Sequence, residues 1–146
     1  MGERVAIVGS RGYPDLEEVM AYVSTLPLDT VVVSGGAWGV DQHAEGTARA
    51  QGLTVVSFLP RQLEGHWRIV RFTLFARSSD SEFLWLSYRD LGSFPEAAHF
   101  RNGLIVQDSD RVEVFWDGHS RGTRNTIRLA EKAGKLGEIH RAGVRA

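Results

Sequence analysis

Three short segments rich in glycine and small polar residues carry groups that could bind a phosphate. They are Gly9-Ser10-Arg11-Gly12, Ser34-Gly35-Gly36-Ala37-Trp38-Gly39 and Asp117-Gly118-His119-Ser120-Arg121-Gly122-Thr123. Glycine lets a ligand approach the backbone without meeting a Cβ atom, serine and threonine hydroxyls donate hydrogen bonds, and Arg11 offers a charged fork. Each segment precedes a predicted helix, whose first N–H groups have no partner within the helix and attract an anion.

A purely structural role is the alternative, because glycine is also common at strand-to-helix turns that bind nothing. The segments contain neither the Walker lysine pattern nor the G-x-G-x-x-G fingerprint, which argues against P-loop hydrolysis and ordinary NAD binding. The histidines, at positions 43, 66, 99, 119 and 140, lack the spacing of metal ligands. We therefore expect neither a metal nor a cofactor.

Asp41 and two tryptophans have two interpretations each. Asp41 lies on the first turn of a predicted helix, where it could accept a hydrogen bond from a ribose hydroxyl or act as a general base. Alternatively, it caps free amides and complements the helix dipole. Trp38 and Trp116 could stack on a base, or serve in core packing or in a dimer contact.

The elements that must position these groups alternate along the chain. Apolar runs predict strands at 5–8, 31–33, 53–58, 111–116 and 136–139, and helical spacing predicts helices at 16–26, 40–51, 97–105 and 123–133. The first helix follows a capping box formed by Asp15 and Glu18. This order predicts a Rossmann-like, three-layer α/β fold with a mainly parallel central sheet and helices on both faces. The glycine-rich segments then meet at the carboxyl edge of the sheet, where ligands of such folds bind.

Residues 59–95 interrupt this alternation, and we expect an irregular insertion there within a single domain spanning residues 1–146. Phe83-Leu84-Trp85-Leu86 could form a further strand. Aromatic residues alternate with arginines at positions 61, 68, 71 and 77, a composition that suits a subunit interface, a lid or a stacking platform for single-stranded nucleic acid. We favour the interface, and hence a homodimer or a higher homo-oligomer.

Composition limits the class of protein. The chain has 146 residues, no cysteine and a formal net charge of −1. The lack of cysteine excludes disulfides and thiolate chemistry, and the near-neutral charge gives no global attraction to nucleic acid. No apolar run approaches the length of a membrane span, and the N-terminus lacks a signal-peptide layout. We expect a cytoplasmic protein without a membrane partner.

Three stretches of the sequence resemble one family. "VAIVGSRGYPD", "VVVSGGAWGVDQHAEGTARAQGLTV" and "HFRNGLIVQDSDRVEVFWDGHSRGTRNTIRLAEKAGK" are similar to the SLOG superfamily of Rossmann-like nucleotide-binding proteins, most closely to its small bacterial and phage branch. The superfamily includes the LOG phosphoribohydrolases, which cut the base from nucleoside monophosphates. It also includes a DNA-processing protein that binds single strands, and sensors of nucleotide-derived signals.

The resemblance implies roles for several residues. Arg101-Asn102 matches the family's arginine-asparagine pair, whose arginine faces the phosphate or base of the ligand, and 117–123 matches its G-G-x-G-T loop in a loosened form. In the phosphoribohydrolases a glutamate that stabilises the ribose cation follows this loop, but Thr126 stands at that position here. An enzyme of this kind would therefore need Asp41 or Asp117 in its place, with Arg101 on the substrate.

The combined prediction is a binding protein or sensor for a nucleotide or a nucleotide-derived small molecule. The alternatives are a nucleoside 5′-monophosphate phosphoribohydrolase and a module that binds single-stranded DNA. The predicted ligand-binding residues are Gly9, Ser10, Arg11, Ser34, Gly35, Gly36, Ala37, Gly39, Asp41, Arg101, Asn102, Asp117, Gly118, His119, Ser120, Gly122 and Thr123.

Overall fold

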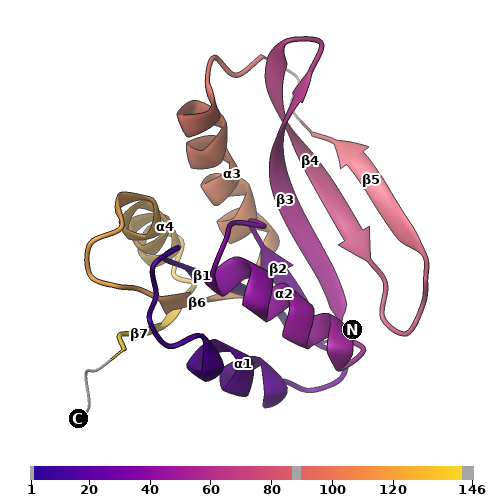
Figure 1. Ribbon diagram of the computed structural model, residues 1–146, viewed down its shortest axis with the longest axis vertical. Coiled ribbons are helices and arrows are strands. Elements are labelled where there is room, and N and C mark those ends of the chain that lie inside the picture. Colours follow the sequence, from indigo (N-terminus) through magenta and orange to yellow (C-terminus); the bar gives the residue numbers. More distant parts are fainter. Residues whose placement is uncertain (1, 87–89, 143–146) are drawn as a thin grey trace.

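A seven-stranded sheet forms the centre of the molecule, in the order β5-β4-β3-β2-β1-β6-β7 (Figure 1). The computed structural model describes residues 2–86 and 90–142. The strands β1 (Arg4–Gly9), β2 (Val31–Ser34), β3 (Thr54–Leu63), β6 (Arg111–Phe115) and β7 (Leu136–His140) pair in parallel. The strands β4 (His66–Leu74) and β5 (Ser81–Trp85) continue the sheet beyond β3 in antiparallel pairing. The predicted α/β fold with a mainly parallel sheet is confirmed.

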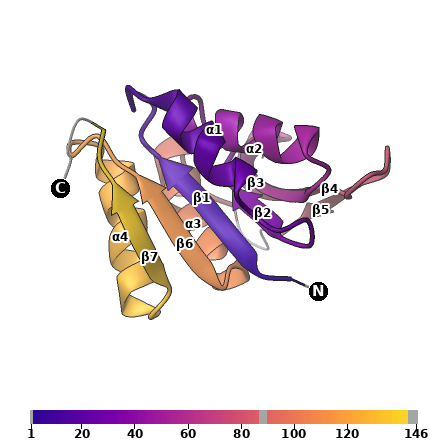
Figure 2. The ribbon, with the colours of Figure 1, turned by 90° about the horizontal axis from the view of Figure 1, so that it is seen from below.

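Within the described residues, four helices cover the two faces of the sheet. They are α1 (Leu16–Ser24), α2 (Val40–Ala50), α3 (Phe94–Asp108) and α4 (Arg121–Lys132). Figure 2 shows α1 and α2 on one face and α3 and α4 on the other. In β1, Val5 and Ile7 pack in the α1–α2 layer, and Ala6 and Val8 pack in the α3–α4 layer. This strand is buried on both faces, which explains its unbroken apolar sequence.

Side-chain caps fix where the helices begin. Asp15 accepts a hydrogen bond from the backbone N–H of Glu18 at 3.1 Å, so the predicted start of α1 is confirmed. The hydroxyl of Ser93 accepts the N–H of Glu96 at the start of α3, and Ser120 caps α4 in the same way. Within the described part of the chain, no helix is long and apolar enough to span a membrane.

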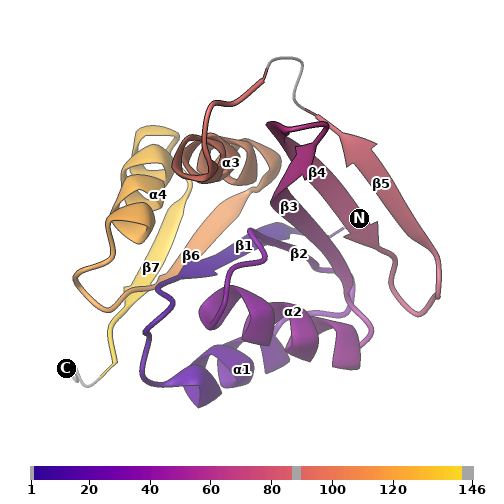
Figure 3. The same ribbon diagram turned by 45° about the horizontal axis from the view of Figure 1, so that its top comes forward.

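The expectation of irregular structure over 59–95 is wrong. Strand β3 extends to Leu63, and β4 and β5 form an antiparallel hairpin, 66–85, that pairs with it along the edge of the sheet. The strand suggested at Phe83-Leu84-Trp85-Leu86 is present as β5, although it begins at Ser81 and ends at Trp85. Residues 87–89 lie outside the described residues. The hairpin extends beyond the helices (Figure 3), and all of β5 is exposed. Without a buried face, β5 has no alternation of apolar and polar residues that the sequence could reveal.

Candidate functional site

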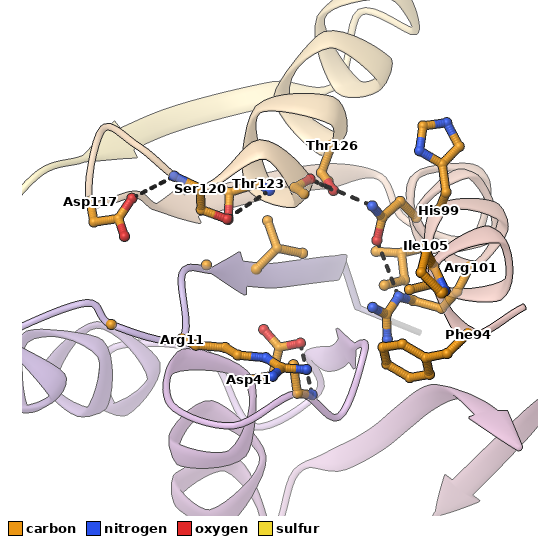
Figure 4. A pocket seen from close by; sticks show the side chains of 18 residues that line it. Arg11, Asp41, Phe94, His99, Arg101, Ile105, Asp117, Ser120, Thr123 and Thr126 are labelled. Carbon is orange, nitrogen blue, oxygen red and sulfur yellow. Dashed lines mark hydrogen bonds between the residues drawn. The ribbon is translucent and has the colours of Figure 1, made fainter.

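A cavity of about 370 Å³ lies at the carboxyl ends of β1 and β6 (Figure 4). This volume is within the range of small-molecule sites, and the position is where open α/β sheets bind ligands. The segments after β1, β2 and β6 all contribute to its wall, together with the first turns of α2, α3 and α4. The described residues contain no group of three or more acidic or histidine side chains that could hold a metal ion.

The cavity brings together most of the predicted charged and polar side chains. Its lining includes Gly9, Arg11, Ala37, Asp41, Arg101, Asn102, Asp117, Ser120, Gly122 and Thr123. The expected meeting of three segments at one edge is therefore seen in the structure. That these residues bind a ligand stays a prediction.

The predicted serine donors at 10 and 34 are turned into the protein. Ser10 is 1% exposed, and its Oγ accepts the backbone N–H of Asp117 at 3.1 Å. Ser34 is fully buried, and its Oγ accepts the N–H of Gly36 at 3.2 Å. Neither residue lines the cavity, so both hydroxyls hold the surrounding loops in place.

In the segment after β2, backbone conformation and close packing explain the presence of glycine without any ligand. Gly36 and Gly39 have φ angles of +69° and +84°, a conformation that favours glycine. A Cβ on Gly35 would lie 2.8 Å from Nη1 of Arg101, so an arginine fills the space that we expected a phosphate to need. Gly122 differs, because it lines the cavity and a Cβ there would have no neighbouring atom within 4 Å.

Arg101 connects α3 to the segment after β2. Its Nη1 donates to the carbonyl oxygen of Gly35 at 2.5 Å, and its Nε donates to Oδ1 of Asn102 at 3.1 Å. The amide of Asn102 in turn donates to the carbonyl oxygen of Gly122 at 3.5 Å. The Arg101-Asn102 pair therefore joins the walls of the cavity through backbone carbonyls.

Asp41 caps its own loop and also leaves one oxygen unpaired. It is 5% exposed, and its Oδ2 accepts the N–H of Ala37 at 3.2 Å. Oδ1 is buried and has no hydrogen-bond partner among the described residues. Burial raises the pKa of Asp41 to about 7, although the positive charge of Arg101 opposes the rise. Both earlier interpretations of Asp41 thus remain open, since the capping contact uses only one oxygen.

The segment after β6 is held by Asp117. Its Oδ1 accepts the N–H groups of His119 and Ser120 at 2.8 Å each, and these bonds lower the pKa of Asp117. His119 is exposed and does not line the cavity, and neither does Gly118. Thr126 is buried, and its hydroxyl donates to the carbonyl oxygen of Gly122 at 3.2 Å. The position at which the resemblance to the phosphoribohydrolases would place a glutamate therefore carries a hydroxyl that is bonded within its own helix.

The first turn of α3 is the part of the site that the sequence analysis missed. Phe94, Pro95, Ala98 and His99 line the cavity. The side chain of Phe94 is 41% exposed, with its ring centroid 5.3 Å from that of Trp67 on β4. The sequence did hold a signal, since Ser93 with Glu96 three residues later is typical of a helix start.

The remaining aromatic and basic candidates lie elsewhere. Trp38 is 70% exposed, so the core-packing interpretation is wrong for it, and neither Trp38 nor Trp116 lines the cavity. Nε1 of Trp116 donates to the carbonyl oxygen of Ser120 at 3.1 Å. On the hairpin, Arg68 pairs with Asp90 at 3.0 Å and Arg71 lies 3.9 Å from Asp108. The hairpin arginines therefore do not form one free basic surface.

A comparison with protein families finds one that covers almost the whole chain. The model of DNA recombination-mediator protein A matches residues 1–137. No curated protein matches the chain.

Solved structures show the same fold. DNA processing protein A from Helicobacter pylori, described with a single-stranded DNA binding mode, matches with a TM-score of 0.62 and 22% identity over 92% of this chain. The protein of that name from Streptococcus pneumoniae matches with a TM-score of 0.66 and 21% identity over 94% of this chain, and TM1055 with 0.56 and 19% over 92%. This chain spans 63%, 49% and 72% of those three chains, respectively.

Proposed function

Because this chain belongs to the DNA recombination-mediator protein A family, we propose that it binds single-stranded DNA at the cavity between α2, α3 and α4. The observation that carries the proposal is the composition of that cavity. Three residues that line the cavity carry it: Arg11 and Arg101 supply guanidinium groups, and Phe94 supplies an exposed aromatic ring. Cations for the backbone and an aromatic face for a base are what a sequence-tolerant single-strand site requires.

We assign the phosphate and the base of a nucleotide to different parts of the cavity. A phosphate would lie near Arg11 and the first turn of α4, where Gly122 leaves open space and the helix dipole favours an anion. The base would lie against Phe94, whose neighbour Trp67 extends the aromatic surface onto β4. Since the formal net charge is −1, binding depends on this local arrangement.

Arg11 is better suited to contact a strand than the hairpin arginines at 68 and 71. It is exposed at the cavity, whereas Arg68 and Arg71 face Asp90 and Asp108. An arginine that already has a carboxylate partner must give up that ion pair to neutralise a phosphate. Arg61 on β3 and Arg77 in the segment between β4 and β5 are exposed and do not line the cavity, so they provide a matched control.

Fluorescence anisotropy with a labelled dT20 strand tests the proposal. Arg11→Ala should weaken binding roughly 10- to 100-fold, the range for a hydrogen bond to a charged group. It should also reduce the dependence of affinity on salt, because one phosphate contact is lost. The double variant Arg61→Ala/Arg77→Ala should bind almost as tightly as the wild type.

Two results would contradict this assignment. Absence of binding at low salt would remove the function itself. A greater loss in the double variant than in Arg11→Ala would place the strand near Arg61 and Arg77 instead of the cavity. A titration with free mononucleotides completes the test. If they bind and the strand does not, the cavity is a nucleotide site, as the sequence first suggested.

A further inference from the structure

The solvent-facing side of α4 carries a row of positively charged side chains. They recur at intervals of three and four residues, which places them on one side of a helix, and all four are exposed. This basic row consists of Arg121, Arg124, Arg128 and Lys132. Helix α4 is the outer member of the α3–α4 layer (Figure 2), and its buried residues lie on its other side. The basic row therefore faces solvent along the length of the helix.

Neighbouring carboxylates do not neutralise the basic row. Among the described residues, none of its four members takes part in an ion pair, whereas Arg4, Arg68 and Arg111 each have an acidic partner. Glu131 is the one carboxylate on α4, and it lies in the last turn. Because the whole chain has a formal net charge of −1, this concentration of positive charge is a local feature that suits an anionic partner.

The basic row begins at the cavity. Ser120, Gly122 and Thr123, which flank Arg121 in the sequence, all line the cavity, and Figure 4 shows Ser120 and Thr123 beside it at the start of α4. At about 1.5 Å of rise per residue, the row extends roughly 16 Å from this point along the helix. A polymer held at the cavity must continue over the protein surface, and the basic row provides a continuous path for a polyanion.

Trp116 brings a further arginine to the start of the basic row. The guanidinium groups of Arg124 and Arg141 lie 5.5 Å and 5.7 Å from the centre of the Trp116 ring. The face of an aromatic ring attracts a cation, so both long side chains are oriented by this contact. Two like charges gathered at one ring repel each other, and a phosphate beside them would offset the repulsion.

We propose that single-stranded DNA leaves the cavity along the basic row of α4, an inference that rests on the proposed binding of such a strand at the cavity. The cavity holds one nucleotide through Arg11 and Phe94, and the basic row contacts the phosphates that follow. Phosphate contacts position a strand without reading its sequence. The partner is a single strand because the path starts where an unpaired base lies against Phe94.

Fluorescence anisotropy with labelled dT20 tests this path in the variant Arg124→Ala/Arg128→Ala. Both arginines are exposed and do not line the cavity, and alanine is a good helix former, so the variant should fold. Its affinity at low salt should fall roughly 3- to 30-fold, the range for two exposed ion pairs. The slope of log affinity against log salt should become shallower by about 1.4, because each phosphate contact of a single strand contributes about 0.7.

Arg61→Ala/Arg77→Ala is the matched control, since it removes the same charge from positions away from α4. Its affinity should change by less than about twofold, because charges further than a Debye length from the strand are screened. A second variant, Arg128→Gln/Lys132→Gln, keeps the contact between Arg124 and Trp116 and should lose affinity in the same way as the first. This variant decides the inference if thermal unfolding shows that Arg124→Ala/Arg128→Ala does not fold.

The outcomes separate this inference from the proposed function. If Arg11→Ala weakens binding while both α4 variants bind like the wild type, the path along α4 is wrong and the cavity site stands. If the α4 variants weaken binding and Arg11→Ala does not, the basic row is the contact surface and the cavity assignment is wrong. An equal loss in the control overturns the path, because the effect is then one of total charge.

Two further outcomes complete the test. If dT20 does not bind at low salt, both the proposed function and the path are wrong. A duplex of the same length that binds as tightly as dT20, and loses affinity in the α4 variants, would assign the basic row to double-stranded DNA and overturn the inference.

Discussion

At the scale of the residue, Asp41 combines a structural contact with an unsatisfied one. Its Oδ2 closes the turn at Ala37, and its Oδ1 is buried without a partner among the described residues. The charged groups that act on it come from two helices, Arg101 on α3 and Glu45 on α2, and Arg11 lines the same cavity. Burial outweighs the attraction of Arg101, so the ionised form is disfavoured in the folded protein.

This leads to a prediction for stability against pH. The pKa of Asp41 rises on folding from its ordinary value of 3.8 to about 7, so between these values the folded state binds more protons than the unfolded state. The contribution of Asp41 to stability is therefore full below about pH 4 and declines as the pH rises toward 7. Asp41→Asn cannot ionise. Its unfolding temperature, relative to wild type, should rise between pH 5 and pH 8.

Thermal unfolding followed by circular dichroism at pH 5, 6, 7 and 8 measures this difference. Glu17→Gln, which removes an exposed carboxylate on α1 that does not act on Asp41, serves as a control for loss of one negative charge. A difference between Asp41→Asn and wild type that stays constant with pH would mean that Asp41 titrates near its ordinary pKa.

The sequence identified the cavity's charged side chains but not how they are arranged. Arg11 and Asp41 line one cavity because segments after parallel strands meet at one edge, and Arg101, which the family resemblance indicated, lines it from α3. The glycines after β2 suggested open space for a phosphate, but the space beside Gly35 is filled by Arg101, which is 66 positions further along the chain. No local pattern reports a contact of that separation.

At the scale of the element, two glycines in similar strand-to-helix segments have different functions. Gly36 has a positive φ, and a Cβ there would collide with the side chain of Leu59. Gly122 is in the first turn of α4 and borders the cavity with open space around it. The first glycine is required by the fold, whereas the second leaves open space at the cavity.

Substitution by alanine should separate these functions. Gly36→Ala should cost about 1–2 kcal/mol of stability for the left-handed backbone alone, with a further cost from Leu59. Gly122→Ala should leave stability unchanged or raised, because alanine is the better helix former, but weaken DNA binding several-fold. Urea unfolding and anisotropy on both variants test the contrast. A Gly122→Ala protein that binds like wild type would show that the strand does not approach α4.

The helices and strands that could be predicted are those whose burial requires a regular pattern of apolar residues in the sequence. The strands β1, β2 and β6 are buried on both faces and appear as short apolar runs. The start of α1 was predictable from its capping residue, Asp15. The hairpin strand β4 carries arginines among aromatics because helices do not cover its outer part, and β5 is exposed throughout. The pairing of β4 with β3 comes from backbone hydrogen bonds, which are independent of side-chain type.

At the scale of the whole molecule, most of the buried apolar residues of the sheet lie on its parallel strands. Phe115 at the end of β6 is fully buried, stacked on His140 and in edge contact with Tyr13 and Tyr22. Phe83 on β5 is 62% exposed, with Phe72 as a ring neighbour at 4.6 Å. Substituting these two phenylalanines therefore compares a buried position near one edge of the sheet with an exposed position at the other edge.

Phe115→Ala should lower the free energy of unfolding by about 3–5 kcal/mol, because it leaves a cavity in the core. Phe83→Ala should cost about 1 kcal/mol or less, mainly the loss of one aromatic pair. Urea denaturation of both variants measures these differences. Similar losses would mean that the hairpin is as integral to the cooperative fold as β6 is.

The direction of the hairpin strands has a consequence for how such chains change over evolutionary time. Since β4 runs against β3 and β5 runs against β4, the chain leaves β5 in the direction in which it left β3. The start of α3, which lines the cavity, is therefore approached from the same side with or without the two strands. Gain or loss of the two strands as a pair would therefore preserve the direction in which the chain enters α3, whereas the loss of one strand alone would deliver the chain to the opposite edge.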